Sequence, residues 1–164
     1  MPVVIEPLAN RHLEGLYAAI NAVAGERIYL GRFSLAPFEE SAKFFQSLID
    51  RDEAAFVAQA DDAVVGWCDI IAIDREPQRH VGVLGMGLVA GHRGKGIGAR
   101  LLTAALDKAW SKGLTRIELT VYGANKPAIA LYDRFGFERE GVKRNFQRID
   151  GLYDDALIMA IVRP

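Results

Sequence analysis

The glycine-rich segment AGHRGKGIGARLL, residues 90–102, constrains the fold of this chain more than any other feature. It follows the apolar run VGVLGMGLV, and beyond it leucines and alanines recur at helical spacing from residue 101 to residue 109. The β-prone run RIELTVY comes next. A strand, a helix and a second strand in this order are joined by a crossover, so the sequence predicts a pair of parallel strands here.

The other β-prone runs predict antiparallel pairs. AAFVAQA and AVVGWCDIIAI are joined by an Asp-Asp pair, and two runs of the tail flank an Asp-Gly turn, so each pair is typical of a hairpin. Three further helices are predicted, one capped by Asn10, one after Pro37 and one capped by Asn125. We therefore expect an α/β (α+β) fold with a mixed, mostly antiparallel central sheet of about seven strands, and with helices on both faces.

Length and composition indicate one globular domain over residues 1–164, because 51% of the residues are hydrophobic and no repeat or linker interrupts the pattern. The formal net charge of -1 gives no general attraction to nucleic acid or to an anionic membrane. No run approaches the ~18 apolar residues of a membrane span, and the first residues lack signal-peptide features, so we expect a cytoplasmic protein. Cys68 is the one cysteine; we expect it to be buried, and we expect no metal site.

The glycines precede a predicted helix, and the N-terminus of a helix attracts anions. Its first backbone N–H groups lack intrahelical partners and carry a partial positive charge. Gly94, Gly96 and Gly98 leave this backbone accessible, and Arg93 and Lys95 lie beside them. A diphosphate is therefore the expected ligand, whereas a flexible turn with a positive surface is the alternative that this segment alone leaves open.

Two other nucleotide-binding patterns fit the segment less well. A P-loop needs a lysine and a hydroxyl residue after its last glycine, and neither follows Gly96. The stretch from Gly94 to Ala99 does satisfy the dinucleotide pattern GxGxxA, and Glu118 follows about 20 residues later, where a ribose-binding acid is expected. Glu118, however, lies inside a predicted strand rather than at its end, and the chain is too short for a second set of parallel units.

HRGKGIGARLL resembles the [RQ]xxGx[GA] signature of the GNAT superfamily of acyl-CoA N-acyltransferases, with Arg93, Gly96 and Gly98 at the signature positions. LGMGLV, upstream, resembles the fourth strand of that family. Downstream, ELTVYGANKPAIALYDRFGFEREG resembles its second motif, NxxAxxLYxxxGF, from Asn125 to Phe137. The predicted element order matches the family over essentially the whole chain. The tail NFQRIDGLYDDALIMA is similar to bacterial members that acetylate amino acids or protein N-terminal amines.

The resemblance implies an N-acetyltransferase that moves an acetyl group from acetyl-CoA to a primary amine of an amino acid or a protein N-terminus by direct transfer. The parallel strands would part at the cofactor site, where backbone groups of Leu88 and Val89 would face the pantetheine arm. The pyrophosphate would lie on the backbone of Arg93, Gly94, Lys95, Gly96, Ile97, Gly98 and Ala99, and Asn125 would add a cofactor contact to its capping role. The alternative is a non-catalytic acyl-CoA-binding sensor or assembly module, and the family also makes a homodimer plausible.

Two proton transfers accompany such a reaction, and the resemblance assigns one of them to Tyr132 as the general acid. A phenol with a pKa of about 10 is protonated at neutral pH and can donate to a departing thiolate. Many relatives carry a carboxylate on the fourth strand, but VGVLGMGLV has none. We expect Glu118 to deprotonate the amine, with Asp69 as the alternative; each is otherwise an ordinary strand carboxylate.

The acceptor amine is expected to enter between the segment GERIYLGRFSLAP, residues 25–37, and the final hairpin. Arg27 and Arg32 carry the charge that would pair with the carboxylate of a free amino acid, and Tyr29 and Phe33 offer apolar surface for a side chain. Acidic residues in the same segments leave an aminoglycoside or a polyamine open as acceptors.

Overall fold

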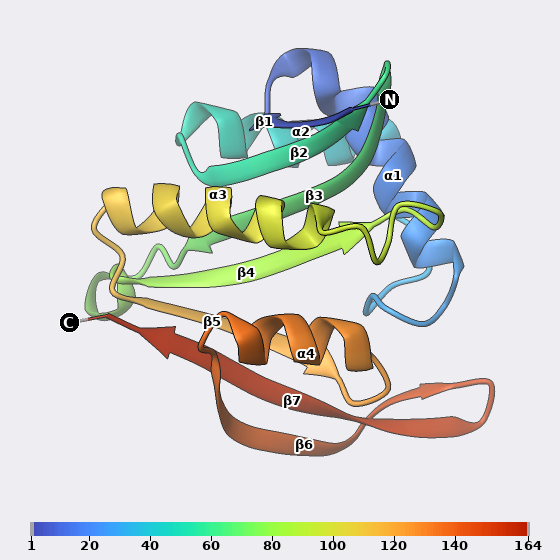
Figure 1. Ribbon diagram of the computed structural model, residues 1–164, viewed down its shortest axis with the longest axis vertical. Coiled ribbons are helices and arrows are strands. Elements are labelled where there is room, and N and C mark those ends of the chain that lie inside the picture. The colour runs from blue at the N-terminus through green and yellow to red at the C-terminus, as the bar shows by residue number, and fades with distance from the viewer. Residues whose placement is uncertain (1, 164) are drawn as a thin grey trace.

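A seven-stranded mixed sheet forms the centre of the protein (Figure 1). The computed structural model describes residues 2–163. The strand order across the sheet is β1-β2-β3-β4-β5-β7-β6. The strands are β1 (Val3–Pro7), β2 (Ala54–Ala60), β3 (Ala63–Ala72), β4 (Val81–Leu88), β5 (Arg116–Tyr122), β6 (Glu138–Ile149) and β7 (Leu152–Val162).

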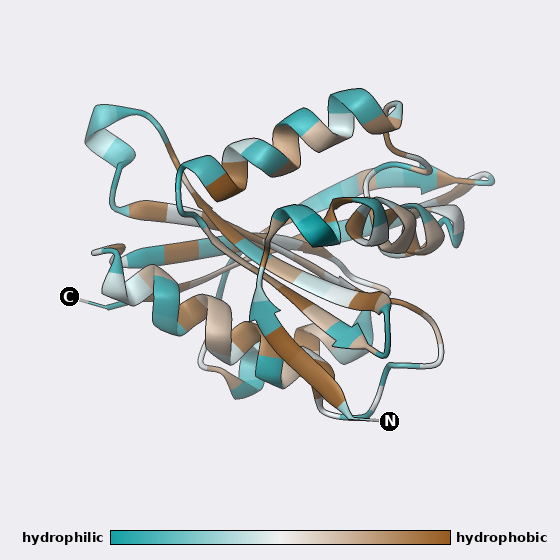
Figure 2. Ribbon diagram, turned by 90° about the horizontal axis from the view of Figure 1, so that it is seen from above, coloured by the Kyte–Doolittle hydropathy of each residue, from teal (hydrophilic) through white to brown (hydrophobic). Residues whose placement is uncertain are grey.

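Helices cover both faces of this sheet, as the view from above shows (Figure 2). They are α1 (Leu13–Gly25), α2 (Phe38–Asp50), α3 (Ile97–Ser111) and α4 (Lys126–Arg134), with short 3-10 turns η1 (Asn10–His12) and η2 (Glu76–Gln78). α1 and α2 pack around Trp67 on one face, and α3 and α4 pack around Ile117 and Met159 on the other. Within residues 2–163, no helix is long and apolar enough to cross a membrane.

β4 and β5 form the parallel pair, and they separate after a short contact. Val81, Gly82 and Val83 pair with residues 116–118, and the register between the two strands ends there. β5 continues beside β7 in antiparallel pairing as far as Tyr122. The sheet therefore opens between the second halves of β4 and β5, next to the glycine-rich segment that connects β4 to α3.

The predicted fold class is confirmed, including the mixed sheet, the helices on both faces and the parallel crossover through α3. One predicted cap is wrong, because Asn10 lies in the turn η1 and does not cap α1. The Ala9 N–H instead donates to Nδ1 of His12 at 3.0 Å, and Nε2 of the same ring lies 3.0 Å from Glu6. The buried ring of His12 thus holds the start of η1, and α1 itself begins without a side-chain cap among residues 2–163.

Candidate active site

The glycine-rich segment forms a loop whose backbone is open to a ligand. Gly94 and Gly96 have φ values of 71° and 78°, a left-handed conformation that glycine adopts without strain. A Cβ at either position would have no heavy atom within 4 Å. The backbone N–H groups of residues 94–99 make no hydrogen bond to the described part of the chain. These donors, together with the N-terminus of α3 at Gly96, form a site suited to an anion.

A cavity of about 650 Å³ extends from this loop, along the end of β4, to α4. Val23 and Tyr29 of the opposite face also line it, so the cavity reaches through the opening of the sheet. The predicted site residues that line it are Leu88, Arg93, Gly94, Gly96, Gly98, Ala99, Asn125 and Tyr132. The predicted site residues that do not line the cavity are Val89, Lys95, Ile97 and Glu118. The side chain of Lys95 is exposed, and that of Ile97, the first residue of α3, is buried in the core.

Arg93 connects the loop to α1 and β4. Its guanidinium donates two hydrogen bonds to Glu26, of 2.9 and 2.6 Å, and its Nε donates to the carbonyl of Leu88 at 2.9 Å. The ring of Tyr29 lies 4.5 Å from the guanidinium carbon. The hydrogen bonds from Arg93 hold the pKa of Glu26 below its ordinary value. The side chain of Arg93 is therefore engaged within the protein, and its backbone is the part left for an anion.

The backbone of Val89 does not face the opening, contrary to the prediction. Its N–H donates to the Val65 carbonyl on β3 at 2.9 Å, and its carbonyl accepts from the His92 N–H at 3.2 Å. Alternate residues of a strand direct their backbone groups to opposite neighbours, so Met86 and Leu88 are the residues of β4 whose backbone faces the opening, although the Leu88 carbonyl is occupied by Arg93. The role predicted for Val89 therefore fits Met86, which also lines the cavity.

The helix α4 presents two residues of the second motif to the cavity. Asn125 caps the helix as predicted, because its Oδ1 accepts from the Ala128 N–H at 3.4 Å. Tyr132 is only 6% exposed, and its ring packs 5.6 Å from the ring of Phe137. Its hydroxyl makes no hydrogen bond to any of residues 2–163 and belongs to the lining of the cavity. The structure thus leaves this hydroxyl available to a ligand.

Burial raises the pKa of Tyr132 well above that of a free phenol, and the neighbouring Cys68 raises it further. Tyr132 is therefore protonated at neutral pH, as a general acid must be. Cys68 is fully buried, as predicted, and burial raises the pKa of its thiol. Because the thiolate is the reactive form of cysteine, Cys68 is unsuited to nucleophilic catalysis.

Glu118 lies on the other face of β5 and is held in an ion pair. Ile117 and Leu119 point into the core beside α3 and α4, so the alternation of the strand turns Glu118 away from that side. Arg116 donates to its Oε2 at 2.9 and 3.1 Å, and the same guanidinium binds Glu140 at 2.6 and 2.9 Å. Its carboxylate is thus occupied by Arg116 and lies outside the lining of the cavity, so the structure argues against the predicted role of Glu118.

The predicted acceptor entrance lies between the α1–α2 connection and the hairpin of β6 and β7. Arg27 donates to Asp150 of the hairpin turn at 3.1 Å, which uses its charge within the protein. Tyr122, at the end of β5, packs 6.3 Å from the ring of Phe146 of the hairpin. Both arginines expected to meet an acceptor carboxylate are exposed, and Arg32 is the one without an ion-pair partner within residues 2–163.

Besides Met86, Arg134 and Glu26 belong to the site although no sequence pattern was used to predict them. Arg134, the last residue of α4, lines the cavity and gives it a cation. Arg134 follows Leu131 by three residues, and this helical spacing predicts that both lie on the side of α4 that lines the cavity. Glu26, the partner of Arg93, lies 67 residues away along the chain, and no local pattern connects the two.

Glu26→Gln tests the contact between α1 and the glycine loop. The variant leaves Arg93 without its counter-charge, so we expect the free energy of unfolding at pH 7 to fall by about 1–2 kcal/mol in chemical denaturation. Because the pKa of Glu26 is lowered in the folded protein, its stabilisation is present above the ordinary carboxyl pKa and is lost as the pH falls through the lowered value. The two proteins should therefore become equally stable in acid.

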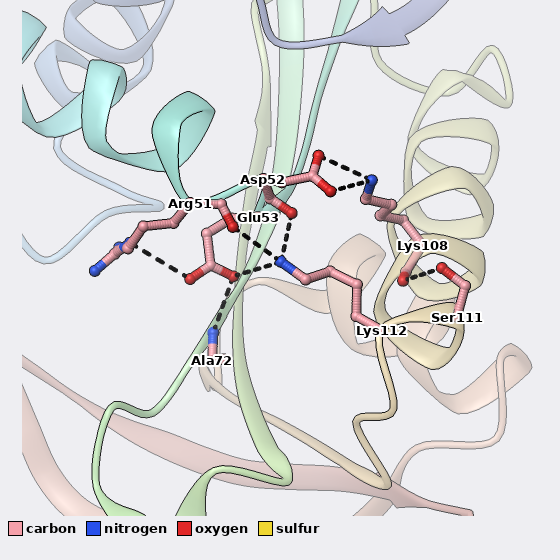
Figure 3. A network of polar contacts seen from close by, with 7 residues as sticks. All are labelled: Arg51, Asp52, Glu53, Ala72, Lys108, Ser111 and Lys112. Atoms are coloured by element: carbon pink, nitrogen blue, oxygen red, sulfur yellow. Dashed lines mark hydrogen bonds and ion pairs between the residues drawn. The ribbon is translucent and has the colours of Figure 1, made fainter.

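The matched control is Asp52→Asn, which removes an exposed ion pair with Lys108 of 2.9 Å (Figure 3). Surface pairs of this kind contribute little, so no measurable loss of stability is expected. Equal stabilities of wild type and Glu26→Gln at pH 7 would contradict the structural role given to the Arg93 contact.

The geometry can be compared with known proteins. The model of the acetyltransferase (GNAT) family matches residues 23–137. The L-amino acid N-acetyltransferase AaaT of Escherichia coli (strain K12) is 31% identical over 158 residues, which cover 93% of this chain and 96% of that protein. The crystal structure of a GNAT-family acetyltransferase from Streptococcus pneumoniae has a TM-score of 0.91 at 26% identity, covering 98% of this chain and 99% of that chain.

A phosphinothricin acetyltransferase from Sinorhizobium meliloti, solved in complex with acetyl-CoA, has the same fold, with a TM-score of 0.91 at 21% identity over 99% of this chain and 89% of that chain. The dinucleotide-binding alternative is excluded, because the described sheet has a single parallel pair instead of repeated parallel units. The family match and the open loop beside a parted β4–β5 pair agree. The chain belongs to the acetyltransferase (GNAT) family and is an acyl-CoA-dependent N-acetyltransferase.

Proposed function

We propose that this enzyme transfers an acetyl group from acetyl-CoA to the α-amine of a free amino acid. The observation that carries the proposal is the cavity of about 650 Å³ that connects the open glycine loop to Tyr132 through the opening between β4 and β5. A long donor with a diphosphate near one end and a thioester at the other fits this path. The choice of an amino acid is supported by the similarity to AaaT, whose name gives L-amino acids as its substrates.

In this proposal the pyrophosphate lies on the backbone N–H groups of residues 94–99. The open conformations of Gly94 and Gly96 support this placement. The exposed Lys95 and the buried Ile97 contribute their backbone groups alone.

The pantetheine arm is proposed to run along the end of β4. Met86 turns its backbone groups to the opening and Leu88 its N–H, and an N–H there would polarise the thioester carbonyl. Asn125 and Arg134 line the cavity from α4 and offer polar contacts to the donor. Arg134 is a cation at a solvent-accessible helix end, so it suits a phosphate group of the coenzyme better than the apolar arm.

Tyr132 is proposed to donate its proton to the departing sulfur. The raised pKa keeps the phenol protonated, and the absence of a hydrogen-bond partner within residues 2–163 leaves the proton available. Acetyl-CoA supplies the activated acyl group as a thioester, whose thiol has a reference pKa of about 8.5. Because this value is lower than the pKa of the phenol, proton transfer to the sulfur is uphill, and it requires the hydroxyl to be in contact with the sulfur while the C–S bond breaks.

The acceptor is proposed to enter from the face that carries α1 and α2. Arg32 would pair with the α-carboxylate, because Arg27 is already bound to Asp150. Tyr122 and Phe146 would pack against the side chain of the amino acid.

Thiol release from acetyl-CoA, measured with a panel of amines, tests the proposal. L-amino acids should accelerate release, and their carboxamides should be poorer acceptors, because they lack the charge that Arg32 binds. Arg32→Gln should raise KM for the amino acid by about 10-fold or more and leave KM for the carboxamide unchanged, as loss of one charge-assisted contact predicts. Ser34→Ala, at an exposed position two residues further along the chain, is the control and should not distinguish the two acceptors.

Faster release with peptides than with any amino acid would assign the acceptor as a protein N-terminus. Tight binding of acetyl-CoA without release in the presence of any amine would favour the sensor or assembly module.

The proposal extends to the cellular setting. A cytoplasmic location fits a chain whose one cysteine, Cys68, is a buried free thiol. A homodimer is supported by apolar side chains exposed on the hairpin of β6 and β7, which are Val142, Leu152 and Tyr153.

A further inference from the structure

The strand β4 has no side chain at two successive positions on the face that it shares with α1 and α2, because Gly85 and Gly87 occupy them. Their register partners on β3 are Asp69 and Trp67. A Cβ at Gly87 would collide with the ring of Trp67, and a Cβ at Gly85 would lie 3.7 Å from Oδ1 of Asp69. Both β3 side chains therefore extend over β4, which is the strand that borders the opening of the sheet.

The carboxyl group of Asp69 has apolar surroundings. It adjoins a cavity of about 40 Å³, lined by α1 and α2 side chains such as Leu16 and Phe45, which is large enough to hold water. Its register neighbours are Ala55 on β2 and Gly85 on β4, neither of which carries a polar side chain. Within residues 2–163, it makes no hydrogen bond or ion pair. Asp69 is therefore free to exchange a proton with a ligand, in contrast to a carboxylate held by arginine.

Glu53 is the charged group whose field acts on Asp69. The charge of Glu53 is itself compensated, as Figure 3 shows. Arg51 and Lys112 lie 3.7 and 3.9 Å from its two oxygens, and the Ala72 N–H donates to it at 3.3 Å. Burial first, and the charge of Glu53 second, raise the pKa of Asp69 to about 7.

We propose that Asp69 is the general base that deprotonates the acceptor ammonium at the opening between β4 and β5, and that Gly85 leaves the space for its carboxylate. The residue thus replaces the fourth-strand carboxylate that VGVLGMGLV lacks. The inference rests on the proposed function, because it requires an amine bound at the opening. Glu118, the rival carboxylate, is committed to Arg116.

The proton and electron transfers balance. Ionised Asp69 takes one proton from R–NH3+, which gives R–NH2 and a neutral carboxylic acid. The nitrogen lone pair then forms the C–N bond while the C–S bond of the thioester breaks, and the Tyr132 hydroxyl gives its proton to the sulfur. The remaining surplus proton on the nitrogen passes through solvent to the Tyr132 oxygen, and Asp69 releases its proton to solvent. The products are one amide, one thiol and one free proton.

The rate should therefore depend on pH through Asp69. For the wild type, kcat/KM for the amine should rise as the pH increases through about 7, where Asp69 ionises. Asp69→Asn should lower kcat by about 10²-fold or more and abolish this rise near pH 7, with KM for acetyl-CoA unchanged. Asp74→Asn, at an exposed carboxylate beyond the end of β3, is the control and should keep the wild-type profile.

Thermal stability gives a second readout, independent of activity. The pKa of Asp69 is higher in the folded protein than in the unfolded chain, so its ionisation destabilises the folded state as the pH rises from about 4 to about 7. Asp69→Asn should therefore have a higher Tm than the wild type at pH 8, and the difference should disappear near pH 4. A lower Tm at pH 8 would contradict the environment described for this carboxyl group.

A rescue variant tests the geometry. Gly85 has no left-handed φ and no other side chain within 4 Å of its would-be Cβ, so Asp69→Asn/Gly85→Glu should place a carboxylate on the fourth strand and recover 10-fold or more of the lost kcat. If Glu118→Gln, rather than Asp69→Asn, abolishes the rise near pH 7 in an active enzyme, this inference alone is overturned. A wild type that acetylates no amine contradicts the proposed function, and this inference with it.

Discussion

Tyr132→Phe is expected to lower kcat by about 10²-fold or more while leaving KM for acetyl-CoA nearly unchanged. The substitution removes one hydroxyl, which lines the cavity and makes no hydrogen bond within residues 2–163. The ring that remains keeps its contact with Phe137 and its burial in the core. The donor should therefore bind as before, and the thiolate should leave without a positioned acid.

Steady-state kinetics with a saturating amine measure this effect, with Tyr153→Phe as the matched control. Tyr153 is 59% exposed on the hairpin and lies outside the cavity, so its variant should keep the wild-type kcat. The Tm of Tyr132→Phe should stay close to that of the wild type, because no hydrogen bond to another of residues 2–163 is lost. An unchanged kcat in the folded variant would remove Tyr132 from the mechanism.

Gly96→Ala is expected to raise the dissociation constant for acetyl-CoA by about 10-fold or more. Gly96 has a φ of 78°, and a side chain in this left-handed conformation destabilises the loop by about 1–2 kcal/mol. The added methyl group also projects from a residue that lines the cavity, beside the N–H groups that are proposed to bind the pyrophosphate. A change of 1.4 kcal/mol in binding free energy corresponds to a 10-fold change in affinity, so either effect is measurable by calorimetry.

Gly113→Ala provides the matched control at the other end of α3. Gly113 has a φ of 90° and, like Gly96, no heavy atom within 4 Å of a would-be Cβ. It should therefore cause a similar loss of stability without any loss of affinity for acetyl-CoA. Equal affinities of the two variants would show that the loop does not hold the donor.

Much of the fold was predictable because it depends on local patterns. The run from β4 through the glycines to α3 shows a strand, a helix start and a crossover in consecutive residues. Asn125 caps α4 because capping needs only a side-chain oxygen at the residue that precedes a helix. The burial of Cys68 follows from the apolar β-prone run around it.

The parts of the site that were predicted wrongly depend on register and on long-range contacts. Val89 and Met86 are both apolar strand residues, and only the pairing of β4 with β3 decides which backbone faces the opening. Glu118 was predicted to be a base, but its carboxylate forms an ion pair with Arg116. The i, i+2 spacing of these two residues on one strand places them on the same face, so this pair could have been predicted. Asn10 does not cap α1, because the chain first makes the turn η1, whose Ala9 N–H donates to the buried ring of His12.

The position of Asp69 also depends on strand register, which the sequence does not specify. The sequence shows an acid in an apolar strand, which is compatible with an arginine partner as well as with a base. The register of β3 and β4 places Asp69 opposite Gly85, and this register cannot be derived from the sequence of either strand alone. We propose that Gly85 on the neighbouring strand leaves the space through which this carboxylate reaches the acceptor.

A crystal structure of the enzyme with coenzyme A tests the central claim most directly. The account predicts that the pyrophosphate accepts hydrogen bonds from the backbone N–H groups of residues 94–99, and that the arm passes between β4 and β5. The sulfur should then lie within hydrogen-bond reach of the Tyr132 hydroxyl. Coenzyme A bound elsewhere, or bound in the cavity with its sulfur away from Tyr132, would contradict the account.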